Sequence, residues 1–196
     1  MGIPHTPFLR QGLTGLAICH FDVKAVSRAT GRSAVAAAAY RSGELLTNER
    51  DGVTHDYARR TGVDGTFIVT PSGCDWASNR SALWNAAESA ERRKDAKVAR
   101  EYVVAIPHEL DAPAREALVR EFAESIVERF GVAADVALHA PGKNGDQRNH
   151  HAHILTTTRI VEAEGLGAKT RQLDTKDTAA KEISGLRELW AMQCNE

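Results

Sequence analysis

A histidine-rich hairpin between two apolar runs constrains the fold of this chain more than any other feature. The apolar run 133–138 leads into His139, a polar loop with a glycine follows, and a second apolar run begins after His153. Side chains two apart on a strand point to the same face, so His151 and His153 project together and His150 projects the other way. Strand pairing across the loop would set His139 beside them.

Three neutral imidazoles that converge from rigid strands can bind a divalent metal and leave coordination positions open for water or substrate. An HxH pair alone is also compatible with two surface histidines on an edge strand. The third histidine across a short turn favours the metal site, and open positions are what a catalytic site needs. The sequence therefore predicts a tri-histidine metal site of the catalytic kind.

Composition bounds the class of protein. The 196 residues suit one domain, or one domain with a small appendage, and 42% hydrophobic with 26% charged residues is ordinary for a globular chain. The formal net charge of -1 gives no global argument for nucleic acid, so DNA contacts would have to come from local patches. Three widely spaced cysteines indicate neither a disulfide framework nor a cysteine zinc site, which fits a cytoplasmic location. No apolar run approaches the roughly 18–20 residues of a membrane span, so no membrane insertion is expected.

Hydrophobic periodicity predicts an α+β fold, a mainly antiparallel sheet of about five strands flanked by helices. The expected strands are 16–26, 66–70, 99–107 and the two apolar runs of the hairpin. The expected helices are 34–45, 75–96, 111–130 and 175–194. Segment 47–65 is predicted to be a surface loop or a short helix, and segment 162–174 a polar loop. No phosphate-binding glycine loop occurs, which argues against nucleotide hydrolysis.

Tyr40 is the distinctive candidate nucleophile. The chain has no GxSxG motif, and no cysteine stands in a suggestive context. Tyr40 is a lone bulky residue with a polar tip on a helix that is otherwise rich in alanine. A tyrosine hydroxyl with a pKa of about 10 needs a base or a cation to ionise, and a metal and Arg41 could both help. The alternative is a tyrosine that packs its ring and hydrogen-bonds its tip.

Four sequence motifs carry a resemblance to a known family. The N-terminal one contains Gly-Arg-Ser-Ala-Val-Ala-Ala-Ala-Ala-Tyr-Arg-Ser, and the last contains Gly-Asp-Gln-Arg-Asn-His-His-Ala-His-Ile. The motifs lie at 20–42, 54–57, 99–110 and 145–154. Together they closely resemble MobA/MobL-type (MobQ) relaxases of conjugative and mobilisable plasmids, most of all the TraA-like branch, within the HUH endonuclease superfamily.

The resemblance implies both a fold and a reaction. Family members nick one DNA strand at a plasmid transfer origin by metal-assisted tyrosine transesterification, and the 5′-phosphotyrosyl intermediate serves conjugative transfer. By position in the motifs, the catalytic tyrosine corresponds to Tyr40 and the metal ligands to His139, His151 and His153. An acidic residue proposed to ready the tyrosine or to position the site corresponds to Glu101. The metal is expected to be Mn, Mg, Zn or Ni.

The same resemblance implies a domain organisation and partners. Residues 1–15 form an N-terminal extension, and residues 16–196 form the relaxase domain, the N-terminal part of a longer relaxase-helicase. Single-stranded DNA at the transfer origin is the implied substrate, with relaxosome accessory proteins and a coupling protein as further partners. Many members have proline where this chain has His150, which leaves open a fourth histidine near the metal.

Local charge supplies the candidate DNA contacts. The candidates surround the tyrosine helix or lie in the metal loop: Arg28, Arg32, Arg41, Tyr57, Arg59, Lys143 and Arg148. Each cation alone could equally be an ordinary solvated charge. Tyr57 could stack on a base or act as a second nucleophile.

Two other functions are compatible with the same residues. One is a tri-histidine metallohydrolase that activates water and needs no tyrosine. The other is a non-catalytic DNA-binding module whose histidines hold a structural metal. Covalent attachment of DNA to Tyr40 would separate the relaxase from both.

Overall fold

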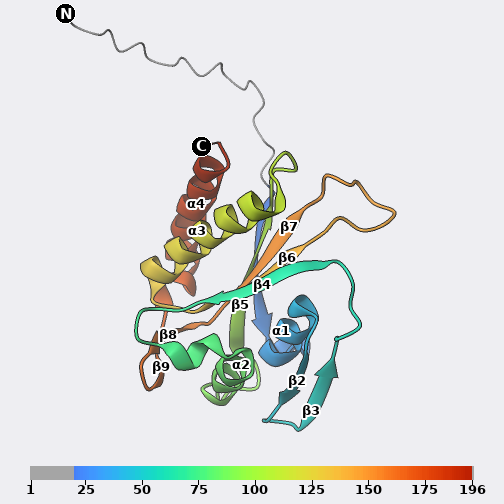
Figure 1. Ribbon diagram of the computed structural model, residues 1–196. Helices are drawn as coiled ribbons and strands as arrows, with labels where there is room; N and C mark the ends of the chain where they lie inside the picture. The colour runs from blue at the N-terminus through green and yellow to red at the C-terminus, as the bar shows by residue number, and fades with distance from the viewer. Residues whose placement is uncertain (1–19, 196) are drawn as a thin grey trace, which may run out of the picture.

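The computed structural model describes residues 20–195, so the expected N-terminal extension lies outside the described residues. A five-stranded antiparallel sheet forms the centre, in the order β1-β5-β7-β6-β4 (Figure 1). Its strands are β1 (Phe21–Ser27), β4 (Val63–Val69), β5 (Lys97–Ala105), β6 (Ala134–His139) and β7 (His151–Thr156). Two hairpins accompany it, β2 (Leu45–Asn48) with β3 (Val53–Asp56) and β8 (Arg159–Glu162) with β9 (Gly165–Lys169).

Helices cover both faces of the sheet. They are α1 (Ala34–Ser42), α2 (Arg80–Ser89), α3 (Ala112–Phe130) and α4 (Lys176–Gln193), with short 3-10 turns η1 (Arg28–Thr30), η2 (Asp75–Ser78) and η3 (Arg171–Leu173). Helices α3 and α4 lie on one face and α1 and α2 on the other (Figure 1). This arrangement confirms the predicted α+β fold and its antiparallel sheet of five strands.

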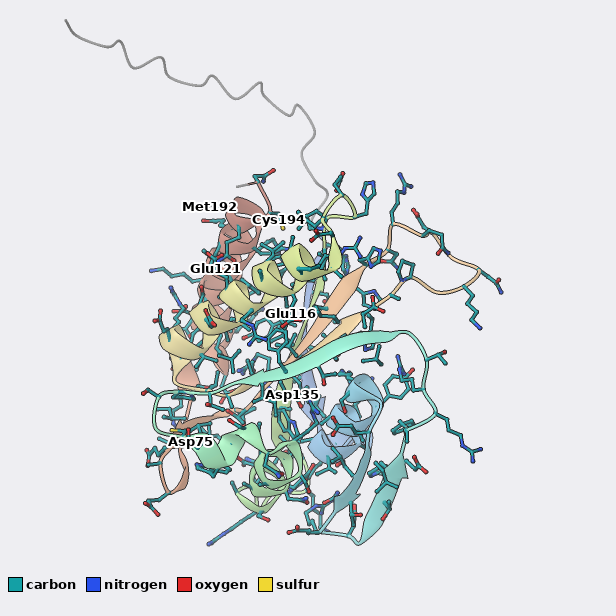
Figure 2. The ribbon with its side chains drawn as sticks, viewed as in Figure 1. Asp75, Glu116, Glu121, Asp135, Met192 and Cys194 are labelled. Atoms are coloured by element: carbon teal, nitrogen blue, oxygen red, sulfur yellow. The ribbon has the colours of Figure 1, made fainter. Side chains whose placement is uncertain are left out.

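Alternation along the strands divides the hydrophobic core between the two faces. Tyr102 of β5 packs with Phe122 and Trp190 beneath α3 and α4. Leu155 of β7 packs with Trp84 beneath α1 and α2. Glu116 and Glu121, labelled in Figure 2, are exposed on α3, which is therefore amphipathic.

A buried carboxylate fixes α2 to the second face. Asp135 of β6 is 5% exposed and points to the side of α2 (Figure 2). It accepts hydrogen bonds from Arg80 at 2.8 Å and from the indole nitrogen of Trp84 at 2.8 Å. Because both partners come from α2, burying this charge holds the helix in one position on the sheet.

The structure corrects the prediction for segment 47–65, which is neither a simple loop nor a short helix. Strands β2 and β3 form a hairpin there, joined by a turn in which Gly52 has a φ of +72°. An Asp-Gly pair in such a turn is a strong hairpin signal that polarity alone conceals. Segment 162–174 is likewise wrong as a polar loop, because β8 and β9 pair around Gly165.

The helix expected at 75–96 is shorter than predicted. A 3-10 turn, η2, occupies Asp75–Ser78, and α2 begins only after Asn79, whose side chain accepts from the backbone nitrogen of Ala82 at 2.9 Å. This N-cap restarts the chain in a new helix direction. None of the helices formed by residues 20–195 is long and apolar enough to cross a membrane.

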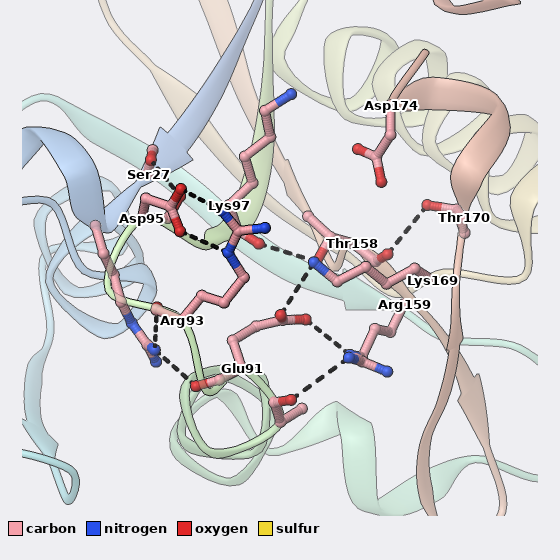
Figure 3. A network of polar contacts seen from close by, with 12 residues as sticks. Ser27, Glu91, Arg93, Asp95, Lys97, Thr158, Arg159, Lys169, Thr170 and Asp174 are labelled. Carbon is pink, nitrogen blue, oxygen red and sulfur yellow. Dashed lines mark hydrogen bonds and ion pairs between the residues drawn. The ribbon is translucent and has the colours of Figure 1, made fainter.

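A network of polar contacts joins the end of α2 to the β8–β9 hairpin (Figure 3). Glu91 accepts from Arg159 at 2.8 Å and pairs with Lys169 at 3.0 Å. The hydroxyl of Thr158 donates to the backbone of Lys97 at the first residue of β5. These contacts lie at the end of the sheet opposite His139 and His151.

Candidate active site

The β6–β7 hairpin brings three histidines together at one end of the sheet. His139 pairs in register with His151, and His153 pairs with Ala137, so all three side chains lie on the face that carries α1. One ring nitrogen from each histidine lies within 4.8 Å of the others. The small side chains of Ala105 and Ala137, opposite His151 and His153, leave room for the rings.

Each of the three imidazole rings has one nitrogen that contacts an oxygen atom of the protein. His153 Nδ1 contacts Glu101 Oε1 at 2.6 Å, and His151 Nδ1 contacts the backbone oxygen of Asn149 at 3.0 Å. His139 Nε2 contacts the backbone oxygen of Arg41 at 2.8 Å. Because these oxygens only accept, the contacting nitrogens carry the protons and the other nitrogen of each ring is free to bind a metal.

Burial keeps two members of the triad, His139 and His151, in the neutral form that binds a metal. His139 is 5% exposed, and burial lowers its pKa to about 4. Burial also lowers the pKa of His151. Neutral imidazoles at pH 7 are what a metal ion requires. The described residues thus form a site that can bind a divalent metal.

A buried carboxylate, that of Glu101, contacts one histidine of the triad. Glu101 of β5 is 3% exposed and accepts from His153 and from both guanidinium donors of Arg41. Burial favours its protonated form, but the hydrogen bonds from His153 and Arg41 outweigh burial and lower the pKa of Glu101 to about 2. The carboxylate is therefore charged at pH 7 and fixes the orientation of His153.

Helix α1 presents Tyr40 beside this site. Ser33 caps the helix, and its buried face consists of small residues such as Ala38 and Ala39, which let its backbone approach the sheet closely. The contact between the backbone oxygen of Arg41 and His139 shows how near the end of the helix comes. Tyr40 lies on the outer side of α1 and is 47% exposed.

Tyr40 and one member of the triad, His153, open onto one cleft. The cleft has a volume of about 580 Å³ and is lined by Tyr40, Glu101, His153, Arg32 and Lys24, among others. The β2–β3 hairpin contributes His55 to the same lining. A phenol, a metal-binding imidazole and two cations thus surround one open space.

The segment after β3 carries two further side chains against Tyr40. The rings of Tyr57 and Tyr40 meet edge to face with centroids 5.1 Å apart. The guanidinium carbon of Arg60 lies 3.7 Å from the centroid of the Tyr40 ring. Tyr57 and Arg60 follow Tyr40 by 17 and 20 residues, and nothing in the sequence indicated that they would contact it.

The structure brings only some of the predicted DNA-binding residues to the cleft. Arg32 is exposed and lines it, and Arg59 is exposed beside the half-buried Tyr57. Lys143 and Arg148 lie on the exposed loop between β6 and β7, which extends beyond the sheet (Figure 1). Arg148 forms an ion pair with Asp146 in that loop.

The side chains of two predicted arginines are bound within the protein, although Arg41 also borders the cleft. The Arg28 side chain is 7% exposed and pairs with buried Glu88 at 2.6 Å. Arg41 is held by Glu101 and by the backbone oxygen of Ala37. His150 turns to the other face of the sheet, where its Nδ1 meets Arg115 of α3 at 3.1 Å, so it lies apart from the triad as strand parity predicts.

Comparison with known proteins assigns a class to this fold and site. The protein-family model described as "MobA/MobL family" matches residues 32–196 of this chain. The chain therefore belongs to the MobA/MobL family. It is 41% identical over 181 residues to "Mobilization protein MobL" of Acidithiobacillus ferridurans, covering 81% of this chain and 47% of that protein. It is 35% identical over 191 residues to "Conjugal transfer protein TraA" of Agrobacterium fabrum, covering 90% of this chain and 17% of that protein.

Solved structures share the architecture. One, from work on the "Molecular Basis of Vancomycin Resistance Transfer in Staphylococcus aureus", has a TM-score of 0.78 and 29% identity and covers 91% of each chain. Another, a metal-bound structure of the conjugative relaxase TrwC in complex with oriT DNA, has a TM-score of 0.58 over 89% of this chain and 68% of that one. At 10% identity, the second likeness shows the fold alone. The chain spans less than half the length of both curated relatives.

Proposed function

We propose that this chain is the nicking domain of a conjugative DNA relaxase, which cuts one strand at a plasmid transfer origin. The observation that carries this proposal is the shared cleft, where an exposed Tyr40 opens onto the same space as His153 of the convergent triad. A metallohydrolase that activates water would have no use for a tyrosine presented in this way. Membership of the MobA/MobL family supports the same conclusion.

The reaction is a transesterification at phosphorus. The Tyr40 hydroxyl loses its proton and its oxygen bonds to the scissile phosphorus, while the bond from phosphorus to the 3′-oxygen breaks and that oxygen takes up a proton. A 5′-phosphotyrosyl enzyme and a free 3′-hydroxyl result. Since a phosphodiester replaces a phosphodiester, the 3′-hydroxyl can reverse the step and reseal the strand.

The histidine triad would hold the divalent metal, as Mn, Mg, Zn or Ni. When bound, such an ion offsets the negative charge that develops on the phosphoryl oxygens. Glu101 acts in this proposal as a positioning residue, because its oxygens are occupied by His153 and Arg41. The resemblance implied two roles for Glu101, readying the tyrosine and positioning the site. We propose the positioning role rather than removal of the tyrosine proton.

Single-stranded DNA would follow the cleft past Tyr40. Arg32 and Lys24 line it and can contact phosphates, and the exposed Arg59, Lys143 and Arg148 would contact DNA outside the cleft. Tyr57 would support the ring of Tyr40. Arg28 and Arg41 are left out of the proposed DNA contacts, because buried carboxylates hold their guanidinium groups.

In the cell, the domain would act on plasmid DNA in the cytoplasm. The family resemblance would place this domain at the N-terminal part of a longer relaxase-helicase, and the match to the TraA relative covers 17% of that protein. Relaxosome accessory proteins and a coupling protein would then be its partners in transfer.

The test is covalent capture of DNA. The protein is mixed with a labelled single-stranded oligonucleotide from its plasmid's transfer origin, with Mn²⁺ or Mg²⁺, and run on a denaturing gel. We expect a labelled protein band that disappears with EDTA and in Tyr40→Phe. Since Tyr40 is 47% exposed, removing its hydroxyl should leave the fold intact, which circular dichroism checks.

Tyr57→Phe is the matched control, because it removes the same hydroxyl from the neighbouring ring. Attachment that survives in Tyr57→Phe and not in Tyr40→Phe assigns the nucleophile. Cleavage without attachment would instead identify a metallohydrolase. DNA binding without cleavage would identify the binding module.

A further inference from the structure

We propose that Arg60 is a phosphate-binding residue of this site, which holds the phosphate that Tyr40 attacks. The proposal rests on the proposed function and adds to it a residue that the sequence motifs do not single out. Three observations carry it: the place of Arg60 on the nucleophile, its lack of a protein anion, and its nearness to the triad.

Arg60 is held in place on the Tyr40 ring. Its guanidinium carbon lies 3.7 Å from the ring centroid, the geometry of a cation–π contact. The backbone nitrogen of Arg60 donates to the backbone oxygen of Tyr57 at 2.8 Å, and the backbone nitrogen of Tyr57 donates in turn to the backbone oxygen of Glu44 at 3.2 Å. Gly43, with a φ of +70°, ends α1, and this segment packs beside it, because a Cβ at Gly43 would lie in ordinary contact with the Arg60 Cβ at 3.9 Å.

The guanidinium of Arg60 has no carboxylate partner within residues 20–195, and its Nε is buried without a hydrogen-bond acceptor. Neighbouring arginines are different: Arg41 is paired with Glu101 and Arg80 with Asp135. Buried donors are almost always satisfied, so an unsatisfied one on the ring of Tyr40, which lines the cleft, points to an absent ligand. A guanidinium is matched best by a carboxylate or a phosphate.

Arg60 also lies close to the triad. The backbone oxygen of Gly62, two residues further along, accepts from the backbone nitrogen of Ala140 at 3.0 Å, and Val63 pairs in register with His139. A cation on the segment that leads into this pairing can contact a phosphate that lies against the triad. As the tyrosine oxygen loses its proton, the added negative charge on the ring strengthens the contact with the guanidinium, which favours attack.

The test measures binding to the scissile phosphate in isolation. All proteins carry Tyr40→Phe, which keeps the ring and prevents turnover, and EDTA removes any contribution from metal. Fluorescence anisotropy gives the affinity for two origin oligonucleotides, one natural and one with an uncharged methylphosphonate at the position mapped by covalent capture. We expect the parent to bind the natural strand about tenfold more tightly.

Arg60→Ala should bind the natural strand about tenfold more weakly and lose the preference for it. Arg60→Lys should keep part of the preference, because the charge remains without the planar fork. Arg92→Ala, which removes an exposed charge after α2, should behave like the parent. Melting curves of all variants verify folding.

A preference for the natural strand that persists in Arg60→Ala would overturn the proposal while leaving the nicking function intact. A wild-type protein that never attaches to origin DNA would fail earlier, in the capture assay, and would remove the proposed function and the role of Arg60 together.

Discussion

The two ends of the central sheet both carry clusters of polar side chains, and they differ in how many of those groups find partners. At the end where β5 begins, Glu91 binds Arg159 and Lys169 (Figure 3), and Arg100 binds Asp174 at 3.2 Å. At the end where β5 finishes, each imidazole of the triad binds one protein oxygen and keeps its other nitrogen free. Among the described residues 20–195, no carboxylate pairs with Arg60.

The difference separates charge that serves folding from charge that serves a ligand. A buried polar network stabilises a fold only when its members are satisfied by one another. Leaving three imidazoles and a guanidinium without full partners costs stability, and a structure tolerates this where a metal and an anion complete the set. Perturbing the two ends should therefore give different effects, on ligand binding at one and on stability at the other.

The largest effect is expected from His153→Ala. Loss of one of three ligands should lower the affinity for Ni²⁺ by at least about 100-fold, measured by calorimetry at pH 7. His150→Ala removes an adjacent imidazole that faces α3, and we expect its affinity to equal that of the parent. Equal losses in the two variants would mean that the triad is not the metal site.

The second effect concerns pH. The folded pKa of His139 is about 4, against 6.5 as its ordinary value, so the unfolded chain binds more protons as the pH falls below 6.5. The stability supplied by the neutral ring is thus full above pH 6.5 and is lost toward pH 4. Between pH 6.5 and 5, where few carboxylates titrate, His139 should account for a fall of about 1.5 kcal/mol in the unfolding free energy.

Urea denaturation of the metal-free protein at several pH values measures this slope. His139→Asn cannot titrate, so its slope should be shallower than that of the parent whatever its absolute stability. Identical slopes would show that this imidazole is not held neutral by burial.

Periodicity and parity predicted much of the triad from the sequence. Strand alternation sets His151 and His153 on one face and His150 on the other, and local hydrogen bonding across a short loop sets His139 beside them. These relations depend on residues close in the chain. The role of Tyr40 came instead from a family resemblance, because one tyrosine on an alanine-rich helix has an equally good structural explanation.

Contacts between distant segments could not be predicted in the same way. The position of Arg60 on Tyr40 depends on how the chain returns after the β2–β3 hairpin, and that hairpin was itself mistaken for a loop or short helix. Arg28 was predicted to contact DNA because the sequence does not reveal its partner, Glu88, which is 60 residues away. Charge in a sequence shows no sign of whether another side chain has already neutralised it.

The smallest effect should come from a substitution at the end of the sheet where β5 begins. Glu91→Gln keeps the size of the side chain and leaves Arg159 and Lys169 without their shared anion. Because these cations are 25% and 26% exposed, solvent screens part of the loss, and the unfolding free energy should fall by only about 1 kcal/mol. Urea denaturation measures this fall, and calorimetry with Ni²⁺ on the same variant should return the parent affinity. A change in metal affinity as large as the change in stability would mean that the two ends are coupled through β5 and β7, and the division between folding charge and ligand charge would fail.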